Sequence, residues 1–145
     1  MSYALQLKSR AAQCIPDAHV MFRFEYIPVE EVETYFTAAD CLVLPYKKIF
    51  QSGVIFLAYH FGLPIIAPDI ASFREDIVDG VTGYICKPDD AGDMAETLHK
   101  FFNSDLFHRA EQVHACIREL AEQKYSWAHI AQQTYAVYAR VLQRT

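Results

Sequence analysis

The sequence predicts an α/β fold in which helices cover both faces of a parallel sheet. Short apolar runs without alternation are typical of strands that are buried on both faces, and here helical patterns of about ten residues or more separate them. This order favours a doubly wound sheet with right-handed crossovers. The chain has 145 residues, 52% of them hydrophobic, which is enough for one hydrophobic core but too few for two separate, well-packed cores. We therefore expect a single domain over residues 1–145.

Four runs of the sequence are expected to form strands. "CLVLP" and "PIIA" are apolar throughout and are bounded by polar or helix-breaking residues. The expected strands are His19–Phe24, Cys41–Pro45, Pro64–Ala67 and Thr82–Cys86. A helix is expected before the first of them, over Tyr3–Cys14. Because such a helix normally follows an earlier strand, we expect the sheet to lack the strand that would precede this helix.

Helical patterns fill the stretches between and after these strands. "IPVEEVETYFTAAD" carries its proline and glutamates in the first turns, where a fixed φ and the helix dipole favour them. Ser52 is a good N-cap, and Gly62 a good left-handed C-cap, for a helix between them. Further helices are expected in "KPDDAGDMAETLHKFF", over Ser104–Gln123 and over Ser126–Arg144, whereas "PDIASFRED" is expected to be a loop.

The composition argues against several classes of function. A formal net charge of −5 and a pI near 5.6 disfavour binding to nucleic acid or to anionic membranes, which need a positive surface. The sequence contains no apolar run long enough for a transmembrane segment and no signal-peptide core, so we expect a cytoplasmic protein. The four cysteines and six histidines are dispersed, and we expect neither a disulfide framework nor a metal site.

The loops that follow the strands mark the candidate site, because ligands of open parallel sheets bind beyond the carboxyl ends of the strands. These loops are Glu25–Ile27, Tyr46–Gly53, Pro68–Glu75 and Lys87–Asp89. The second leads into an apolar helix whose first amides have no internal partner and whose dipole is positive at that end. Glycine weakens a helix by about 0.5–1 kcal/mol relative to alanine. Gly53 therefore needs a reason, and the close approach of a phosphate to bare amides supplies one.

Two interpretations of this helix start remain open. Ser52 and Gly53 are equally compatible with an ordinary helix cap that binds nothing. Lys47 and Lys48 add positive charge near a diphosphate, although adjacent lysines in loops are usually just solvated.

From about Val20 to Tyr138 the sequence resembles the C-terminal half of a GT-B-fold glycosyltransferase of family 4, the retaining group 1 type. The resemblance is carried by "MFRFEYIPVEEVETYFTAADCLVLPY", by "LAYHFGLPIIAPDIASFREDIVDGVTGYICKPDD" and by the late "YSWAHIAQQTYAVY". It implies a Rossmann-like, nucleotide-sugar-binding domain with extra C-terminal helices. The substrate it implies is a donor such as a UDP- or GDP-sugar, and it implies no cofactor.

The resemblance also implies roles for individual residues. Tyr26 and Ile27 fall in the turn expected to contact the base, and Ser52, Gly53 and Val54 at the helix start expected to hold the diphosphate. Ala71–Glu75 falls where a loop near the sugar is expected, and Glu75 matches a recurrent acidic residue; a solvated carboxylate at a helix start is the alternative. The expected donor-binding residues are Tyr26, Ile27, Tyr46, Gln51, Ser52, Gly53, Val54 and Glu75.

The sequence departs from the family pattern at important positions. The family has a pair of glutamates that would fall at Ile49 and Leu57. The triplet Gln51-Ser52-Gly53 resembles a subset of the family in which this pair is replaced. In that subset, the resemblance implies a polar contact between Gln51 and the sugar. The first strand of this half, with its glycine, arginine and lysine, is expected before Met1, together with an acceptor-binding N-terminal domain. No residue is nominated as catalytic, and the isolated chain is expected to have little or no activity.

The resulting prediction is a donor-binding domain for retaining transfer of a sugar from a nucleotide-sugar to an unknown acceptor. The alternatives are a non-enzymatic nucleotide- or phosphate-binding regulatory module, a sugar-nucleotide epimerase and a purely structural fragment. The last helix carries an aromatic stripe, Trp127, Tyr135 and Tyr138. Such stripes are usually core, and we expect it to pack on the domain's own sheet; the alternative is self-association through this helix.

Overall fold

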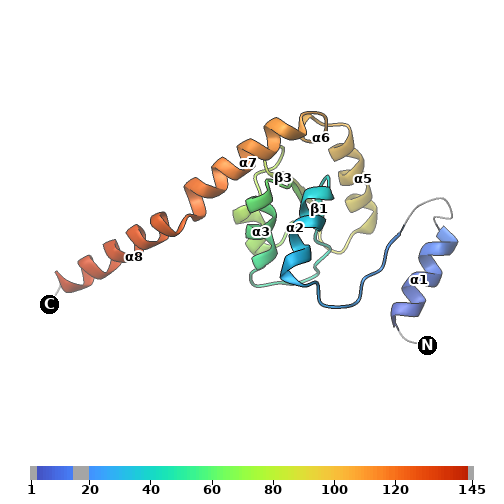
Figure 1. Ribbon diagram of the computed structural model, residues 1–145, viewed down its shortest axis with the longest axis horizontal. Coiled ribbons are helices and arrows are strands. Elements are labelled where there is room, and N and C mark those ends of the chain that lie inside the picture. Colours follow the sequence, from blue (N-terminus) through green and yellow to red (C-terminus); the bar gives the residue numbers. More distant parts are fainter. Residues whose placement is uncertain (1–2, 15–19, 144–145) are drawn as a thin grey trace. The chain divides into compact units, whose positions relative to one another are not determined.

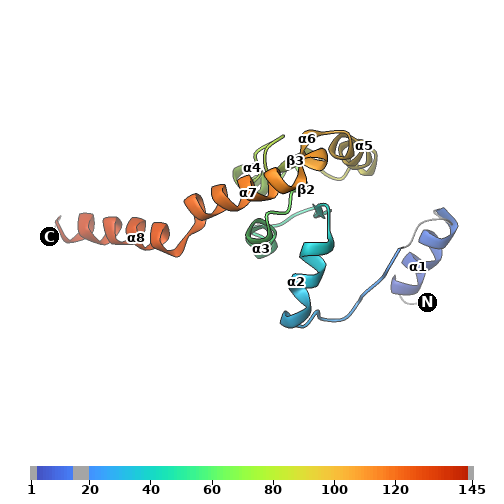
Figure 2. The same ribbon diagram turned by 45° about the horizontal axis from the view of Figure 1, so that its top comes forward.

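The computed structural model describes residues 3–14 and 20–143. These residues form two compact units, Met1–Val32 and Glu33–Thr145, each of which is described by itself. Figures 1 and 2 show the elements of both. That residues 1–145 make a single domain stays a prediction.

The first unit begins with α1, Tyr3–Cys14, as predicted. The rings of Phe22 and Phe24 stack 5.9 Å apart, and the ammonium of Lys8 lies 5.7 Å from the Phe24 ring centroid. The strand predicted over His19–Phe24 is wrong for its described part, Val20–Phe24, which is not in a strand; His19 lies outside the described residues. A strand needs a neighbour for its backbone N–H and C=O groups, and no described segment pairs with this one.

The sheet of the second unit is parallel, as predicted, and has three strands among the described residues. They are β1 (Leu42–Val43), β2 (Ile65–Pro68) and β3 (Gly83–Cys86), in the order β1-β2-β3. Leu42 pairs with Ile65, and Ile65 with Gly83. All three strands therefore end at the same edge of the sheet.

Successive residues of β2 face opposite sides of the sheet, and each side has its own core. Ile65 and Ala67 belong to a first cluster with the helices α3 (Gly53–Phe61), α4 (Ala71–Asp76) and α7 (Ala110–Tyr125), whereas Ile66 belongs to a second cluster with α5 (Ala91–Phe102) and α6 (Asp105–His108). Because every residue of β2 is buried, the run "IIAP" has no polar face, which is why it showed no alternation.

The remaining helices follow the prediction with three differences. The helices are α2 (Val29–Ala38), α3 (Gly53–Phe61), α4 (Ala71–Asp76), α5 (Ala91–Phe102), α6 (Asp105–His108), α7 (Ala110–Tyr125) and α8 (Trp127–Leu142). The expected loop after β2 contains α4, anchored by the fully buried Phe73. The expected helix over Ser104–Gln123 is divided at Arg109, because Leu106 turns into the second core cluster.

The third difference concerns α8, which was expected to pack on the sheet. No residue of α8 is buried, and Trp127, Tyr135 and Tyr138 are 86%, 74% and 65% exposed. Figures 1 and 2 show α8 continuing beyond the end of α7, away from the sheet of its unit. The aromatic stripe is therefore bare within the described residues.

Gly62 ends α3 in the left-handed conformation, with φ 75°, as predicted. A Cβ at this position would lie 2.4 Å from the carbonyl oxygen of His114 in α7. The glycine thus serves two purposes, since it reverses the chain before β2 and lets α3 approach the backbone of α7.

We expect Gly62→Ala to destabilise the fold by more than the roughly 1–2 kcal/mol that a left-handed non-glycine residue costs, because backbone atoms of α7 cannot yield. Gly80→Ala is the matched control: Gly80 also has φ 75°, but its Cβ would meet nothing closer than 4.0 Å. Urea denaturation of both variants measures the difference. Equal losses would show that the contact with α7 contributes nothing.

Candidate functional site

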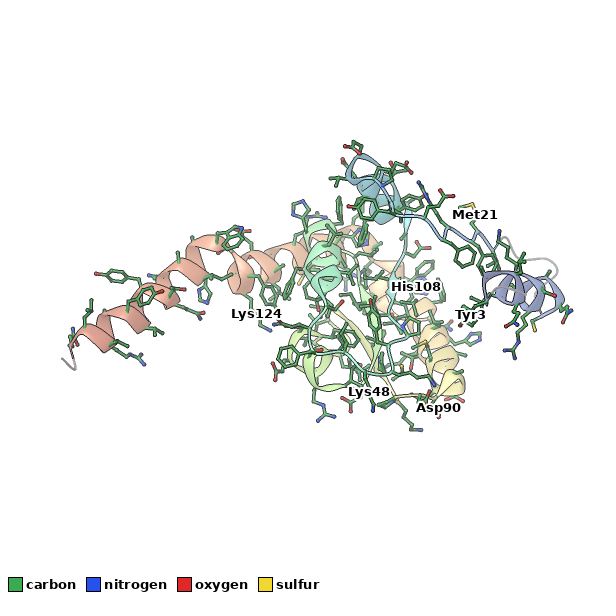
Figure 3. The ribbon with its side chains drawn as sticks, turned by 90° about the horizontal axis from the view of Figure 1, so that it is seen from below. Tyr3, Met21, Lys48, Asp90, His108 and Lys124 are labelled. Atoms are coloured by element: carbon green, nitrogen blue, oxygen red, sulfur yellow. The ribbon has the colours of Figure 1, made fainter. Side chains whose placement is uncertain are left out.

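The carboxyl ends of the three strands border a shallow depression of about 180 Å³. Pro45 follows β1, Pro68 ends β2 and Lys87 follows β3, so each strand contributes to its wall. The other lining residues are Tyr46, Lys47, Asp89, Asp90, Ala91 and Met94. Figure 3 shows Lys48 and Asp90 at this same edge of the molecule. We call this hollow the strand-tip depression.

The start of α3 lies in the loop that follows β1. Ser52 occupies the N-cap position with extended backbone angles, φ −128° and ψ 108°, but its side chain makes no capping hydrogen bond. The first amides of a helix have no partner within the helix, and here the N-cap side chain supplies none. The predicted N-cap position is confirmed, while the predicted side-chain cap is absent.

Gly53 opens this helix start to its surroundings. A Cβ built on Gly53 would meet no atom within 4 Å, and its φ is not in the left-handed range. Neither a backbone conformation nor a close packing contact within the described residues therefore requires glycine here. The contrast with Gly62, which the fold requires sterically, is direct.

Of the other predicted site residues in the second unit, Tyr46 lines the strand-tip depression, whereas Gln51, Val54 and Glu75 are not among its lining residues. The Tyr46 ring packs 5.9 Å from that of the buried Phe73, which holds the start of the loop. Gln51 is exposed, and Val54 is half-buried against the first core cluster. Tyr26 and Ile27 belong to the first unit; Tyr26 is 83% exposed, and the expected contact of this turn with a base stays a prediction.

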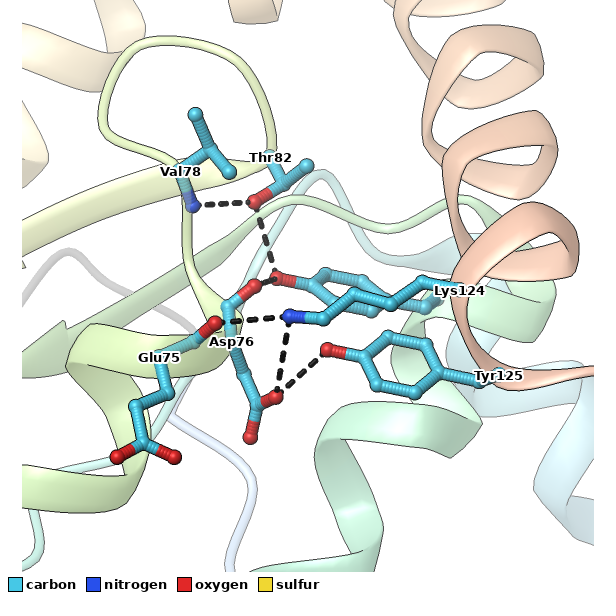
Figure 4. Close-up of polar contacts among 7 residues, drawn as sticks. Glu75, Asp76, Val78, Thr82, Lys124 and Tyr125 are labelled. Atoms are coloured by element: carbon cyan, nitrogen blue, oxygen red, sulfur yellow. Dashed lines mark hydrogen bonds and ion pairs between the residues drawn. The ribbon is translucent and has the colours of Figure 1, made fainter. Parts of the chain in front are cut away.

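Glu75 lies in the last turn of α4 and not at a helix start, so the alternative of a solvated carboxylate at a helix start is wrong in its position but right in its exposure. Its side chain is exposed, and Figure 4 shows its carboxylate directed away from Lys124. Its backbone carbonyl accepts a hydrogen bond of 2.8 Å from Lys124 Nζ. In the same helix Ser72 Oγ is buried and has no hydrogen-bond partner among the described residues, which is an unusual state for a buried hydroxyl.

A polar network joins α3 and the end of α7 to the segment between α4 and β3 (Figure 4). Tyr59 Oη lies 2.9 Å from the carbonyl oxygen of Asp76 and 2.9 Å from Thr82 Oγ1. Since a carbonyl only accepts, Tyr59 donates to Asp76 and accepts from Thr82. Tyr125 Oη donates to Asp76 Oδ1 at 2.6 Å, and Lys124 Nζ lies 3.7 Å from the same oxygen. We call Tyr59, Asp76, Thr82 and Tyr125 the Asp76 network.

Sequence reasoning did not identify the Asp76 network. The residues that its hydrogen bonds join are 17 to 49 positions apart along the chain, and no local pattern connects them. Burial raises the pKa of the Tyr59 hydroxyl to about 12, the bond from Thr82 offsetting part of this. Burial and the bond to Asp76 raise the pKa of Tyr125 as well.

Ion pairs flank the strand-tip depression. Lys47 Nζ lies 2.6 Å from Asp89 Oδ1, and Lys87 Nζ lies 3.1 Å from Asp93 Oδ1. The hydrogen bond to Asp89 raises the pKa of Lys47, so this lysine is fully charged at neutral pH.

Among residues 3–14 and 20–143, no three His, Cys, Asp or Glu side chains are grouped so that they could hold a metal ion. Within the same residues, no helix is long and apolar enough to cross a membrane.

A family described as "Glycosyl transferases group 1" matches residues 4–104. The D-inositol 3-phosphate glycosyltransferase of Mycolicibacterium smegmatis is 27% identical over 78% of this chain and 25% of its own length. The alpha-maltose-1-phosphate synthase of the same organism is 29% identical over 81% of this chain and 31% of its own length. The chain thus spans about a quarter to a third of the curated relatives that it matches.

Solved structures show the same fold at low identity. Sucrose-phosphate synthase from Thermosynechococcus elongatus superposes with a TM-score of 0.76 at 20% identity, over 97% of this chain and 35% of that one. Anabaena HepE in complex with UDP superposes with a TM-score of 0.75 at 18% identity, over 95% of this chain and 37% of that one. These similarities confirm the predicted fold class, a parallel sheet with flanking helices that forms the C-terminal half of a GT-B glycosyltransferase.

The Asp76 network predicts a loss of stability at alkaline pH. Because the folded pKa of Tyr59 is raised from 10.0 to about 12, its contribution is complete below pH 10.0 and is lost as the pH rises towards 12. We expect Tyr59→Phe to be less stable at neutral pH, by about 1–3 kcal/mol, but to lose less further stability over this window. Thermal unfolding at pH 8 to 11 measures both. An unchanged alkaline slope would contradict the placement of the Tyr59 hydroxyl.

Proposed function

Because the chain belongs to the group 1 glycosyl transferases, we propose that the strand-tip edge of its sheet binds the diphosphate of a nucleotide-sugar donor. The phosphates lie against the first amides of α3, at Ser52, Gly53 and Val54. The observation that carries this proposal is the start of α3, where a Cβ on Gly53 would meet no atom within 4 Å and the Ser52 side chain makes no capping hydrogen bond. An anion at this position accepts hydrogen bonds from the unpaired amide N–H groups and interacts favourably with the helix dipole.

Two further observations support a nucleotide-sugar as the ligand. Anabaena HepE, which has the same fold, was solved in complexes with UDP and with UDP-glucose. The partnerless Ser72 Oγ in α4 follows β2 at the carboxyl edge and is a candidate hydrogen-bond donor to the sugar. Tyr46 and Gln51 border the same edge, Glu75 in α4 is proposed to face the sugar, and Tyr26 and Ile27 are proposed to contact the base.

The reaction proposed for the whole protein is retaining transfer of the sugar to an acceptor, as in family 4. In such a step the departing diphosphate gains negative charge, and helix amides that already point at it stabilise that charge without reorganisation. Ile49 and Leu57 stand where the family has carboxylates, so this chain lacks those two groups. We therefore propose that it acts as the donor-binding half in the cytoplasm, and that an acceptor-binding half completes the active site.

The proposal is tested by NMR titration of the chain with UDP, GDP and ADP. We expect amide shifts centred on Ser52–Ile55 for at least one of these diphosphates, because the ligand binds directly to that helix turn. Binding of free phosphate or mononucleotides with equal or greater affinity would favour a regulatory phosphate-binding module instead. No response to any nucleotide would contradict the proposal.

Substitution of Gly53 separates the binding site from an ordinary helix cap. Since an added Cβ meets nothing in the protein, Gly53→Ala should stabilise the fold by roughly 0.4–1 kcal/mol. The same methyl group should weaken UDP binding because it covers the amides, and Gly53→Val should weaken it further. Urea denaturation and calorimetric titration measure the two effects. Higher stability with unchanged UDP affinity would identify Gly53 as a simple cap residue.

The bare aromatic stripe of α8 supports a second part of the proposal, association through this helix. An apolar stripe on a helix normally packs against another surface, and α8 has no buried residue. The two proposed partners are a second copy of the chain and the acceptor-binding half of the enzyme.

In the absence of an acceptor-binding half, we expect the chain to self-associate in sedimentation equilibrium. Tyr135→Glu and Tyr138→Glu should shift it towards the monomer, because they place charge on the stripe. Gln132→Glu adds the same charge at a polar position of α8 and serves as the control. A monomer at all concentrations would exclude self-association and leave the acceptor-binding half as the proposed partner.

A further inference from the structure

Two loops that are far apart in the sequence meet across the strand-tip depression. Lys47 comes from the loop between β1 and α3, and Asp89 from the turn between β3 and α5. Their ammonium and carboxylate groups are 2.6 Å apart, although the side chains are 77% and 68% exposed. Lys48, the next residue, has no ion pair among the described residues. The fold therefore distinguishes two lysines that the sequence alone presents as equivalent.

The backbone at Asp89 is unusual. Asp89 has φ 56°, and it is the one non-glycine residue with positive φ among the described residues. Aspartate and asparagine tolerate this conformation better than other side chains, but the conformation is not free of cost. The positive φ directs the turn so that the Asp89 carboxylate reaches Lys47. Because neither side chain is buried, this contact fits a role at the binding site better than a role in packing.

We propose that Asp89 occupies, on Lys47, the place that a donor phosphate takes when it binds, so that this ion pair sets the affinity of the site for nucleotide diphosphates. This inference rests on the proposed function. Lys47 stands in the loop that ends at Ser52 and Gly53, and its long flexible stem lets the ammonium turn from one anion to another. When the diphosphate binds at α3, Lys47 leaves Asp89 and pairs with a phosphate oxygen.

The magnitude of the ion pair makes this exchange feasible. An exposed pair between two flexible side chains is weak and screened by salt, so its loss is a small cost. A nucleoside diphosphate carries more negative charge than a carboxylate, and it is also held by the helix dipole of α3. The diphosphate therefore displaces Asp89 from Lys47, whereas a singly charged anion binds Lys47 about as strongly as Asp89 does.

The experiment compares UDP affinities of single and double variants by calorimetric titration. Asp89→Asn keeps a residue that accepts the left-handed backbone and removes the charge; we expect UDP to bind roughly two- to five-fold more tightly, the range of a weak exposed pair. Lys47→Met should weaken binding several-fold, and Lys48→Met, the matched control, should change it much less. In the Lys47→Met background, Asp89→Asn should have no effect, because its influence passes through Lys47. Thermal unfolding should show all variants folded, since these side chains are exposed.

The outcomes separate this inference from the proposed function. If wild-type chain binds UDP at α3 but Asp89→Asn leaves the affinity unchanged, the exchange is overturned and the donor site stands. If Asp89→Asn tightens binding equally with and without Lys47, the effect is a general reduction of negative charge, and the exchange is overturned again. Equal losses in Lys47→Met and Lys48→Met overturn it as well. If the wild-type chain binds no UDP, both proposals fail together.

Discussion

The pairing of β2 with both of its neighbours is the interaction on which the rest of the second unit depends. β2 is parallel to β1 and to β3 and is buried on both faces. Parallel pairing requires a crossover connection between successive strands. The two helices that connect the strands, α3 and α4, pack in the first core cluster, and α5, which follows β3, packs in the second. Parallel pairing also brings the ends of all three strands to one edge. Without this pairing the start of α3, Lys47 and Asp89 would have no reason to lie near one another.

The two edges of the sheet serve different purposes. At the amino edge, Tyr59, Asp76, Thr82 and Tyr125 satisfy each other's hydrogen bonds in a partly buried network, and that network ties the end of α7 to the segment after α4. At the carboxyl edge, the contacts are exposed ion pairs, an uncapped helix start and a buried serine hydroxyl without a partner. Rigidity at one edge and unsatisfied polar groups at the other are what a binding site on a stable support requires.

Much of this arrangement was predictable from local patterns. The buried strands were recognised as apolar runs, Ser52 and Gly62 marked the ends of α3, and the helix in "KPDDAGDMAETLHKFF" was expected. In that helix, α5, the Asp90 carboxylate accepts a hydrogen bond from the amide of Asp93. The predictions failed where a distant contact changes a local preference. Phe73 is buried on the sheet and turns an expected loop into α4, and Val20–Phe24 has a strand pattern without a strand to pair with. The stripe of α8 has helical spacing, but spacing does not reveal whether a core lies beside it.

By itself, the sequence determined the fold class and most of the helix boundaries, because apolar periodicity, caps and glycines act over a few residues. It also indicated the loop that we propose as the diphosphate site. Only the tertiary structure decided that Gly53 faces open space whereas Gly62 touches α7, and that Lys47 rather than Lys48 meets Asp89. The physical reason is the same in each case. Close approach, burial and ion pairing depend on the distance between segments far apart in the chain, and that distance exists only once β1, β2 and β3 have paired.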